Sequence, residues 1–177
     1  GRQSCDRGVG RCFGSTRVAT KIFSPELISR FADIVGAANA LTGTDDKAPY
    51  LREWRDRYTG KTPVVLRPRT TDEVSRILAL AHDEGIGIVA QGGNTGLVGG
   101  QIPSPTGDQI VLSLTRMKKV RDVDAAGGTM IVEAGVTLAE AQHAAEGAGR
   151  LFPLSLASEG SATIGGVLAT NAGGTAV

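Results

Sequence analysis

The stretch VAQGGNTGLVGG, residues 89–100, decides how the rest of this sequence is interpreted. It continues an apolar run, Ile86 to Ala90, that predicts a buried strand. Glycine accepts a positive φ and has no Cβ, so glycine-rich main chain can approach a ligand closely. Successive N–H groups in such a turn point into one concavity that binds anions. The stretch predicts a phosphate-binding loop, to which Asn94 and Thr95 can add side-chain donors, although alone it fits a plain glycine-rich turn equally well.

Three other glycine-rich phosphate motifs do not fit this stretch. A P-loop requires a lysine after its last glycine, and no lysine follows these glycines. The letters of a dinucleotide fingerprint occur at Gly85, Gly87 and Ala90, but they follow a helix pattern and contain the strand, which is the wrong order. A kinase glycine loop needs a lysine on a nearby strand, and none fits. Any phosphate bound here is therefore held mainly by main-chain dipoles.

A second cluster of small residues, EGSATIGGVLATNAGG, occupies residues 159–174. It mixes glycine and alanine with hydroxyl and amide side chains, so it can pack closely against a flat ligand or another backbone. A strand hairpin and a helix are predicted between the two clusters. The two segments could therefore line opposite sides of one extended ligand.

Composition restricts the class of protein. The 177 residues suffice for one domain or slightly more. The 25 glycines are about twice the average usage of ~7%. With a net charge of +1 and only 4% aromatic residues, we expect no nucleic-acid partner. No apolar run approaches the ~20 residues that span a bilayer, so we expect no transmembrane segment.

Both ends of the sequence are unusual. Residues 1–23 carry five basic residues against the single acid Asp6, which is typical of a mitochondrial transit peptide. They have no amphipathic apolar stripe, so we favour a disordered or artefactual leader over a targeting signal. Cys5 and Cys12 lie in this leader and are interpreted as incidental thiols of a reducing compartment. We expect a cytoplasmic protein, or one of the mitochondrial matrix if the leader is a transit peptide.

The other elements mix helices and strands. Ser24 and Pro25 predict a helix start, and Thr70 and Thr137 each begin a T-x-x-E capping box. The pattern predicts an irregular region or short helical turn over 39–60, strands over 64–66, 86–90, 109–114 and 151–156, a hairpin of 119–124 with 129–134, and helices from 70 and over 137–149. A hairpin among crossovers predicts an α+β fold without repeats.

Taken together, these motifs resemble a known family. QGGNTGLVGG, with TPVVLRPRTTDEVSRILALA before it and VEAGVTL and LFPLSLASEGSATIGGVLATNAGG after it, resembles the FAD-binding PCMH-type domain of the vanillyl-alcohol-oxidase-like FAD-linked oxidases. Within the family the sequence is most similar to the D-lactate, glycolate and D-2-hydroxyglutarate dehydrogenases. The resemblance covers about residues 24–177. It implies the amino-terminal portion of that domain, incomplete at its C-terminus, with the substrate domain absent.

The resemblance also implies site residues. Those that look like the loop around the FAD pyrophosphate are Gly92, Gly93, Asn94, Thr95, Gly96 and Leu97. Those that look like the stretch beside the isoalloxazine and ribityl chain are Pro153, Leu154, Gly160, Ser161, Thr163, Ile164, Gly166, Thr170 and Asn171. Members that attach the flavin covalently use a histidine or cysteine in or near these loops. Neither residue occurs there, so we expect non-covalent FAD.

The implied activity is oxidation of a D-2-hydroxy acid to a 2-oxo acid by hydride transfer to flavin N5, with an unknown electron acceptor. The catalytic residues, the metal-binding histidines and the substrate arginine are expected in the absent carboxyl-terminal part. This segment alone should therefore be inactive. The alternatives are a non-catalytic nucleotide-binding fragment or frameshifted product, and an FAD enzyme of the same fold with another substrate class, such as a cell-wall precursor reductase. Oligomerisation stays open.

The remaining polar residues favour structural roles. His82 lies in a predicted helix, and His143 with Glu146 forms an i, i+3 pair without a third ligand, so we expect no metal site. Glu133 is interpreted as structural. Three arginines are interpreted as a solvated charge cluster: Arg52, Arg55 and Arg57. Three aromatic residues are interpreted as loop packing: Tyr50, Trp54 and Tyr58.

Overall fold

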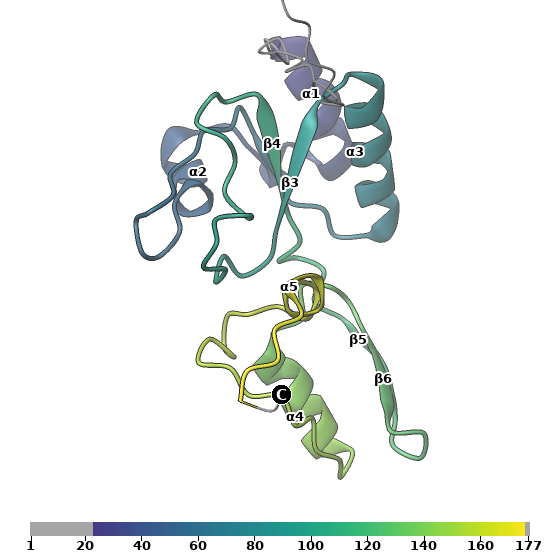
Figure 1. Ribbon diagram of the computed structural model, residues 1–177. Coiled ribbons are helices and arrows are strands. Elements are labelled where there is room, and N and C mark those ends of the chain that lie inside the picture. Colours follow the sequence, from purple (N-terminus) through teal and green to yellow (C-terminus); the bar gives the residue numbers. More distant parts are fainter. Residues whose placement is uncertain (1–22, 176–177) are drawn as a thin grey trace, which may run out of the picture.

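The protein is described by a computed structural model that covers residues 23–175. In chain order the elements are α1 (Pro25–Val35), the 3-10 turn η1 (Ala37–Asn39), β1 (Ala40–Leu41), α2 (Thr44–Leu51), β2 (Val65–Leu66), α3 (Thr71–Asp83), β3 (Gly87–Gln91), β4 (Gln109–Ser113), β5 (Val120–Asp124), β6 (Thr129–Val132), α4 (Leu138–Gly147) and α5 (Ile164–Thr170). They form an upper lobe, residues 23–118, and a lower lobe, residues 119–175 (Figure 1).

The upper lobe is built on a four-stranded sheet with the order β1-β2-β4-β3. β4 runs parallel to both β2 and β3, with Val111 paired to Val65 and to Val89. β1 is antiparallel to β2 at the edge. The chain leaves β2, passes through α3 and returns as β3 on the far side of β4, which is the crossover that parallel strands require. The expected α+β fold is confirmed.

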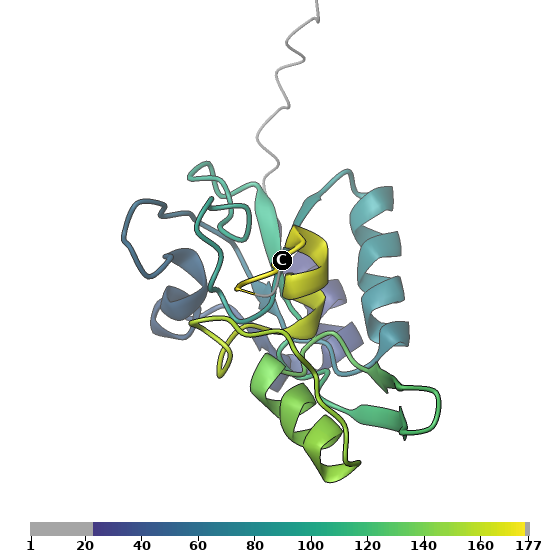
Figure 2. The same cartoon turned by 60° about the horizontal axis from the view of Figure 1, so that its bottom comes forward.

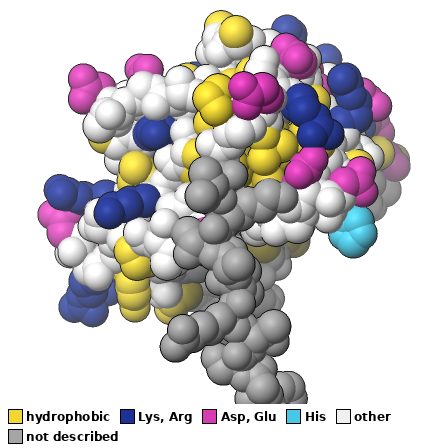
Figure 3. Space-filling model, turned by 90° about the horizontal axis from the view of Figure 1, so that it is seen from above, with side chains coloured by type: hydrophobic (Ala, Val, Ile, Leu, Met, Phe, Trp, Pro, Cys, Tyr) yellow, Lys and Arg dark blue, Asp and Glu magenta, His cyan; other side chains and the backbone are white. Residues whose placement is uncertain are grey.

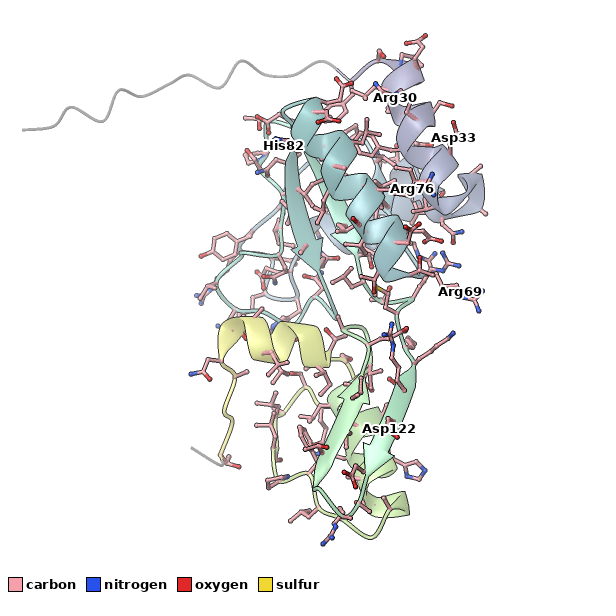
Figure 4. The ribbon with its side chains drawn as sticks, turned by 90° about the vertical axis from the view of Figure 1, so that its right-hand side faces the viewer. Arg30, Asp33, Arg69, Arg76, His82 and Asp122 are labelled. Atoms are coloured by element: carbon pink, nitrogen blue, oxygen red, sulfur yellow. The ribbon has the colours of Figure 1, made fainter. Side chains whose placement is uncertain are left out.

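One face of this sheet is covered by α1 and α3, which lie side by side in Figure 4. Phe31 of α1 and Ile77 of α3 are fully buried against Leu66 and Ile110 of the sheet. Each such side chain contributes roughly 1.5–3 kcal/mol by leaving water. Arg30 and Arg76 lie on these two helices among exposed charges. This packing holds the carboxyl ends of the parallel strands in place. The glycine-rich segment over residues 92–101, called the glycine loop below, begins at the end of β3.

The three predicted helix starts are confirmed, with different caps. The Ser24 hydroxyl accepts from Leu27 N at 3.2 Å. Thr137 and Glu140 form the complete reciprocal box, with both backbone bonds made. Thr70 accepts from Glu73 N, but the Glu73 carboxylate accepts from Arg69 N at 2.6 Å, one residue before the position that the box predicts. Only half of the predicted box therefore forms at α3.

The lower lobe contains the predicted hairpin. β5 and β6 are antiparallel, and the Asp124 carboxylate accepts from Ala126 N and Gly127 N at 3.0 and 2.9 Å, which orders the turn. α4 packs on one side of the hairpin and α5 lies between α4 and the upper lobe (Figures 1 and 2). α5 is thus the helix of the lower lobe that faces the glycine loop.

Three expectations need correction. The predicted strand over 151–156 is wrong: this segment is irregular, and Leu154 O accepts from the Gln142 side chain at 2.7 Å instead of a strand partner. The helix α5 was not expected, because two glycines disfavour it; Ile164 N and Gly165 N donate to Val136 O and Ala134 O, and these tertiary bonds fix its first turn. The region 39–60 is more regular than expected, since it holds β1 and α2.

The leader lies outside the described residues, apart from its last member. Phe23, which the sequence analysis assigns to the leader, packs against the core, so the folded part includes it. Cys5 and Cys12 lie outside the described range. Acidic and basic side chains are interleaved on the face shown in Figure 3. Among residues 23–175 no helix is long and apolar enough to cross a membrane.

Candidate cofactor-binding site

A cavity of about 650 Å³ lies between the two lobes. Its walls come from both glycine-rich segments: the loop after β3 on one side, and the segment from Leu156 through α5 on the other. The lining residues are Ala90, Gly92, Gly93, Asn94, Thr95, Gly96, Leu97, Val98, Gly100, Gln101, Leu156, Ser158, Ala162, Thr163, Gly166, Val167, Ala169, Thr170 and Ala172. The volume is within the range of about 300–1,000 Å³ found for ligand pockets.

The two segments touch each other at the floor of this cavity. A Cβ on Gly93 would overlap the carbonyl oxygen of Ser161, and one on Gly92 would overlap the Thr163 hydroxyl. Thr163 itself is only 4% exposed. Glycine at 92 and 93 is therefore required by chain-to-chain packing, which is a different reason from the ligand approach that the sequence suggests.

The main chain of the loop has free donors. Among the described residues, no backbone N–H from Gly92 to Gln101 donates to another protein group. Buried or half-buried N–H groups without a partner are rare, because each costs the free energy of a lost hydrogen bond. Asn94 is left-handed with φ +55° and Gly99 has φ +77°, and such residues give the concave turns in which successive N–H groups converge. The loop is thus a donor-rich surface without an acceptor.

The cavity walls are neutral. None of the described residues that line it carries a charge, and Leu97, Val98, Leu156 and Val167 supply apolar surface. Main-chain donors beside apolar walls suit a ligand that joins a polyanion to flat rings. A dinucleotide with a pyrophosphate and two aromatic ring systems has this composition, and FAD is one. The donor set therefore fits the cofactor expected from the sequence.

Comparison with known proteins agrees with this geometry. The sequence profile of the family described as "FAD binding domain" matches residues 62–177. The chain belongs to this family. D-2-hydroxyglutarate–pyruvate transhydrogenase of Saccharomyces cerevisiae is 37% identical over 156 residues, which are 87% of this chain and 31% of that protein. The mitochondrial D-2-hydroxyglutarate dehydrogenase of Bos taurus is 39% identical over 134 residues, or 76% of this chain and 24% of that protein.

Solved structures show the same fold. An alkyldihydroxyacetonephosphate synthase has a TM-score of 0.77 at 22% identity, covering 86% of this chain and 33% of that one. A p-cresol methylhydroxylase has a TM-score of 0.65 at 20% identity, covering 81% of this chain and 28% of that one. The chain spans about a third or less of the length of these relatives. FAD is the cofactor of the domain, and the resemblance stated from the sequence is confirmed.

The FAD-binding domain brings together the whole of the first predicted group and part of the second. All six residues of the loop line the cavity, and from the second segment Thr163, Gly166 and Thr170 do so. The Thr170 hydroxyl donates to Gly166 O at 2.9 Å, so it is tied to its own helix. The predicted residues outside the lining are Pro153, Leu154, Gly160, Ser161, Ile164 and Asn171. Of these, Ser161 contacts the loop through its carbonyl, and Asn171 ends α5 in the left-handed conformation.

Asn94 is used differently from the expectation. Its amide nitrogen donates to Pro49 O at 3.2 Å and to Arg52 O at 2.8 Å, so both side-chain hydrogens are bonded to protein. Its Oδ1 is buried and has no partner among the described residues. Ten lining residues were not among the predicted site residues: Ala90, Val98, Gly100, Gln101, Leu156, Ser158, Ala162, Val167, Ala169 and Ala172. Val98 and Gln101 lie in or directly beside the quoted stretch, and that proximity was the available signal.

A loop over residues 52–60 supports the glycine loop from outside. The Tyr58 ring lies against Gly99, where an added Cβ would be 2.7 Å from the ring. Within the loop over residues 52–60, Glu53 is only 1% exposed, and its carboxylate accepts from Arg55 N and Arg57 N at 2.7 and 2.6 Å. Burial raises the pKa of Glu53, but these main-chain donors together outweigh it, so the pKa lies below its usual value. Glu53 was not singled out in the sequence.

The other polar residues lie away from the cavity. His82 lies at the end of α3 that is far from the lower lobe (Figure 4). Within residues 23–175 no three histidine, cysteine or acidic side chains gather as a metal site would require. Arg52 pairs with Asp56 at 3.3 Å, and Arg55 stacks on the exposed Trp54 ring. Glu133 accepts from Lys119 N and from Arg121, consistent with a structural role at the base of the hairpin.

Proposed function

We propose that the full-length protein is an FAD-dependent dehydrogenase that oxidises a D-2-hydroxy acid, with D-2-hydroxyglutarate as the first candidate. The observation that carries the proposal is the single cavity formed by both glycine-rich segments, with unpartnered N–H groups along Gly92 to Gln101. The substrate class is supported by the names of the relatives, which are D-2-hydroxyglutarate and D-lactate dehydrogenases at 33–40% identity.

The residues of this chain would bind and orient the cofactor. The N–H groups of Gly92 to Gln101 would donate to the pyrophosphate oxygens, replacing the water that solvates them when the cavity is empty. Leu97, Val98 and Val167 would exclude water from the rings and the ribityl chain. The bound flavin supplies the electron acceptor for the hydride that leaves the substrate α-carbon. No histidine or cysteine lines the described cavity, which supports non-covalent attachment.

The proposal assigns the remaining chemistry to polypeptide beyond this sequence. The cavity walls contain no side chain able to act as a general base at neutral pH or to pair with a substrate carboxylate. We therefore expect the substrate base, the carboxylate clamp and any metal ligands in the part of the relatives' length that this chain does not span. The isolated segment should bind FAD weakly and turn over no substrate. The electron acceptor and the oligomeric state stay open.

The relatives' names also support a location. Several are called mitochondrial, which favours the mitochondrial matrix over the cytoplasm for this protein. Mitochondrial localisation of the full-length protein, fused at its C-terminus to a fluorescent protein, would support this location. A diffuse cytoplasmic signal would contradict it.

The activity is tested with the full-length, FAD-loaded protein under anaerobic conditions. We expect D-2-hydroxyglutarate to bleach the flavin absorption band, with D-lactate and glycolate as the comparison substrates. L-2-hydroxyglutarate is the matched control, because it has the same charge and size and the opposite configuration at the α-carbon that carries the hydroxyl. If none of the D-acids and glycolate reduces the flavin, this substrate class is rejected, and the candidate with the same fold and another substrate takes its place.

A further inference from the structure

The glycine loop is held by amide side chains that bind its carbonyl groups. Gln91, at the end of β3 and 2% exposed, donates through Nε2 to Tyr50 O at 3.0 Å and to Gln101 O at 2.9 Å. Gln101 Nε2 donates to Gly96 O at 2.8 Å. None of these bonds uses an N–H of the loop main chain.

Gln91 occupies a central position in this arrangement. Gln91 directly precedes the loop, and its amide donates to Gln101 O at the end of the loop and to Tyr50 O in α2. Asn94 makes a second connection to the same part of the chain, through Pro49 O and Arg52 O. The loop is thus fixed against residues 49–52 at its base and near its middle.

The direction of these bonds affects which side of a loop peptide group is left for a ligand. A peptide group that is held by its carbonyl oxygen presents its N–H on the opposite side. Gly96 O shares its peptide group with Leu97 N–H, so the bond from Gln101 turns this N–H away from the amide. The bond from Gln91 to Gln101 O fixes the end of the loop, whose N–H groups from Gly92 to Gln101 have no acceptor among the described residues. Preorganised donors bind an anion more tightly, because ordering the loop costs nothing at the moment of binding.

We propose that Gln91 is a positioning residue for FAD: it sets the geometry of the pyrophosphate loop by bonding its base to the end of α2, without touching the cofactor. Gln91 does not line the cavity, whereas the residues on either side of it, Ala90 and Gly92, do. The proposal rests on FAD binding in this cavity. It assigns to residues 49–52 the role of a support for the cofactor loop, although they are far from it in sequence.

The test compares FAD affinity and apo-protein stability in the full-length protein. Gln91→Met keeps the length of the side chain and removes both donors without adding charge. We expect its FAD Kd to rise by about tenfold or more, because a loop that is no longer anchored has to be ordered when the cofactor binds. Asn39→Leu is the matched control, since Asn39 makes a single amide bond to Val35 O at the end of α1, away from the loop. Its Kd for FAD should stay within about twofold of wild type.

A second pair of variants separates positioning from general destabilisation. Gln91→Glu places a carboxylate against two carbonyl oxygens, so its FAD Kd should improve as the pH falls and the carboxyl becomes a donor, a trend that Asn39→Asp should not show. If Gln91→Met fails to fold, the milder Gln91→Asn, which keeps the amide but shortens its reach to Tyr50 O and Gln101 O, carries the test with an expected rise in the FAD Kd of several-fold.

The outcomes are distinguishable from failure of the proposed function. If wild-type protein does not bind FAD, the proposed function itself is rejected, and the role of Gln91 with it. If wild type binds FAD and Gln91→Met binds it equally well, or Asn39→Leu loses as much affinity as Gln91→Met, only the positioning role is overturned. A selective loss in Gln91→Met, with an apo unfolding midpoint close to that of Asn39→Leu, supports it.

Discussion

Single residues fix the contact between the two glycine-rich segments. At Gly93 the obstacle to a larger side chain is the main-chain oxygen of Ser161, which cannot rotate away as a flexible side chain could. At Gly92 it is the hydroxyl of Thr163, a nearly buried residue. Since both contacts form the floor of the cavity, a Cβ at either position has to move one wall relative to the other.

We expect Gly93→Ala to weaken FAD binding by roughly tenfold or more, equivalent to about 1.4 kcal/mol, because the loop must shift away from Ser161. Fluorescence titration of FAD into the apo-protein measures the change. Gly147→Ala is the control, since a Cβ there meets nothing within 4 Å and Gly147 lies at the end of α4, outside the cavity lining. Equal losses in both variants would contradict this geometry.

Glu53 should make the folding stability of the protein depend on pH through the loop over residues 52–60. Its pKa is lowered in the folded protein, so the ionised carboxylate contributes stability above the unfolded pKa of about 4.3. That contribution disappears as the pH falls through the lower folded value. Glu53→Gln should therefore be less stable than wild type near neutral pH, since its amide group turns a donor toward the Arg55 or Arg57 N–H.

Thermal unfolding at several pH values between about 7 and 3 checks this expectation. The difference in unfolding temperature between wild type and Glu53→Gln should become smaller toward the acid end of this pH range. Glu146→Gln, at an exposed carboxylate of α4, is the control and should follow wild type at each pH. A constant difference between wild type and Glu53→Gln across the whole range would show that the Glu53 charge does not stabilise the loop.

At the scale of elements, helix caps decide which helices start independently of their surroundings. α4 begins with a complete capping box, in which Thr137 N donates to Glu140 at 2.7 Å and Glu140 N donates to Thr137 Oγ1 at 3.2 Å. α5 has no side-chain cap and contains two glycines, so its start depends on bonds to Ala134 O and Val136 O. The two helices of the lower lobe thus form for different reasons.

Thr137→Ala should cost about 1 kcal/mol of unfolding free energy, the usual loss for a removed N-cap hydroxyl. Chemical denaturation of the FAD-free protein measures it. Thr71→Ala is a matched control, because Thr71 lies in the first turn of α3 without being its N-cap. A Thr137→Ala protein as stable as Thr71→Ala would mean that the box contributes nothing to α4.

At the scale of the whole molecule, the cavity lies between the lobes, so a ligand in it contacts both. In hydrogen–deuterium exchange, FAD should protect the N–H groups of residues 92–101, which have no protein acceptor among the described residues. The hairpin turn over residues 125–128 lies outside the cavity lining and serves as the internal control. Protection of the turn without protection of residues 92–101 would place FAD elsewhere.

Much of the fold was predictable because its signals are local. Ser24, Thr70 and Thr137 cap helices with their own next turn, and the hairpin turn is ordered by Asp124 beside it. The irregular segment over 151–156 and the helix α5 were not predictable in this way. Their backbone partners, Gln142, Ala134 and Val136, are brought to them by the packing of the lower lobe.

The sequence by itself determined the chemistry of the site: two stretches of bare main chain, neutral and rich in small residues, at a spacing typical of a FAD-binding domain. Only the tertiary structure decided which atoms serve it. Glycine is needed at 92 and 93 because the Thr163 hydroxyl and the Ser161 carbonyl lie against them. Asn94 is bonded to Arg52 O, and Gln91 is bonded to Tyr50 O and Gln101 O. Composition and local spacing are encoded along the chain, whereas contacts between residues 40 or more positions apart depend on how the chain folds within the upper lobe and how the two lobes pack.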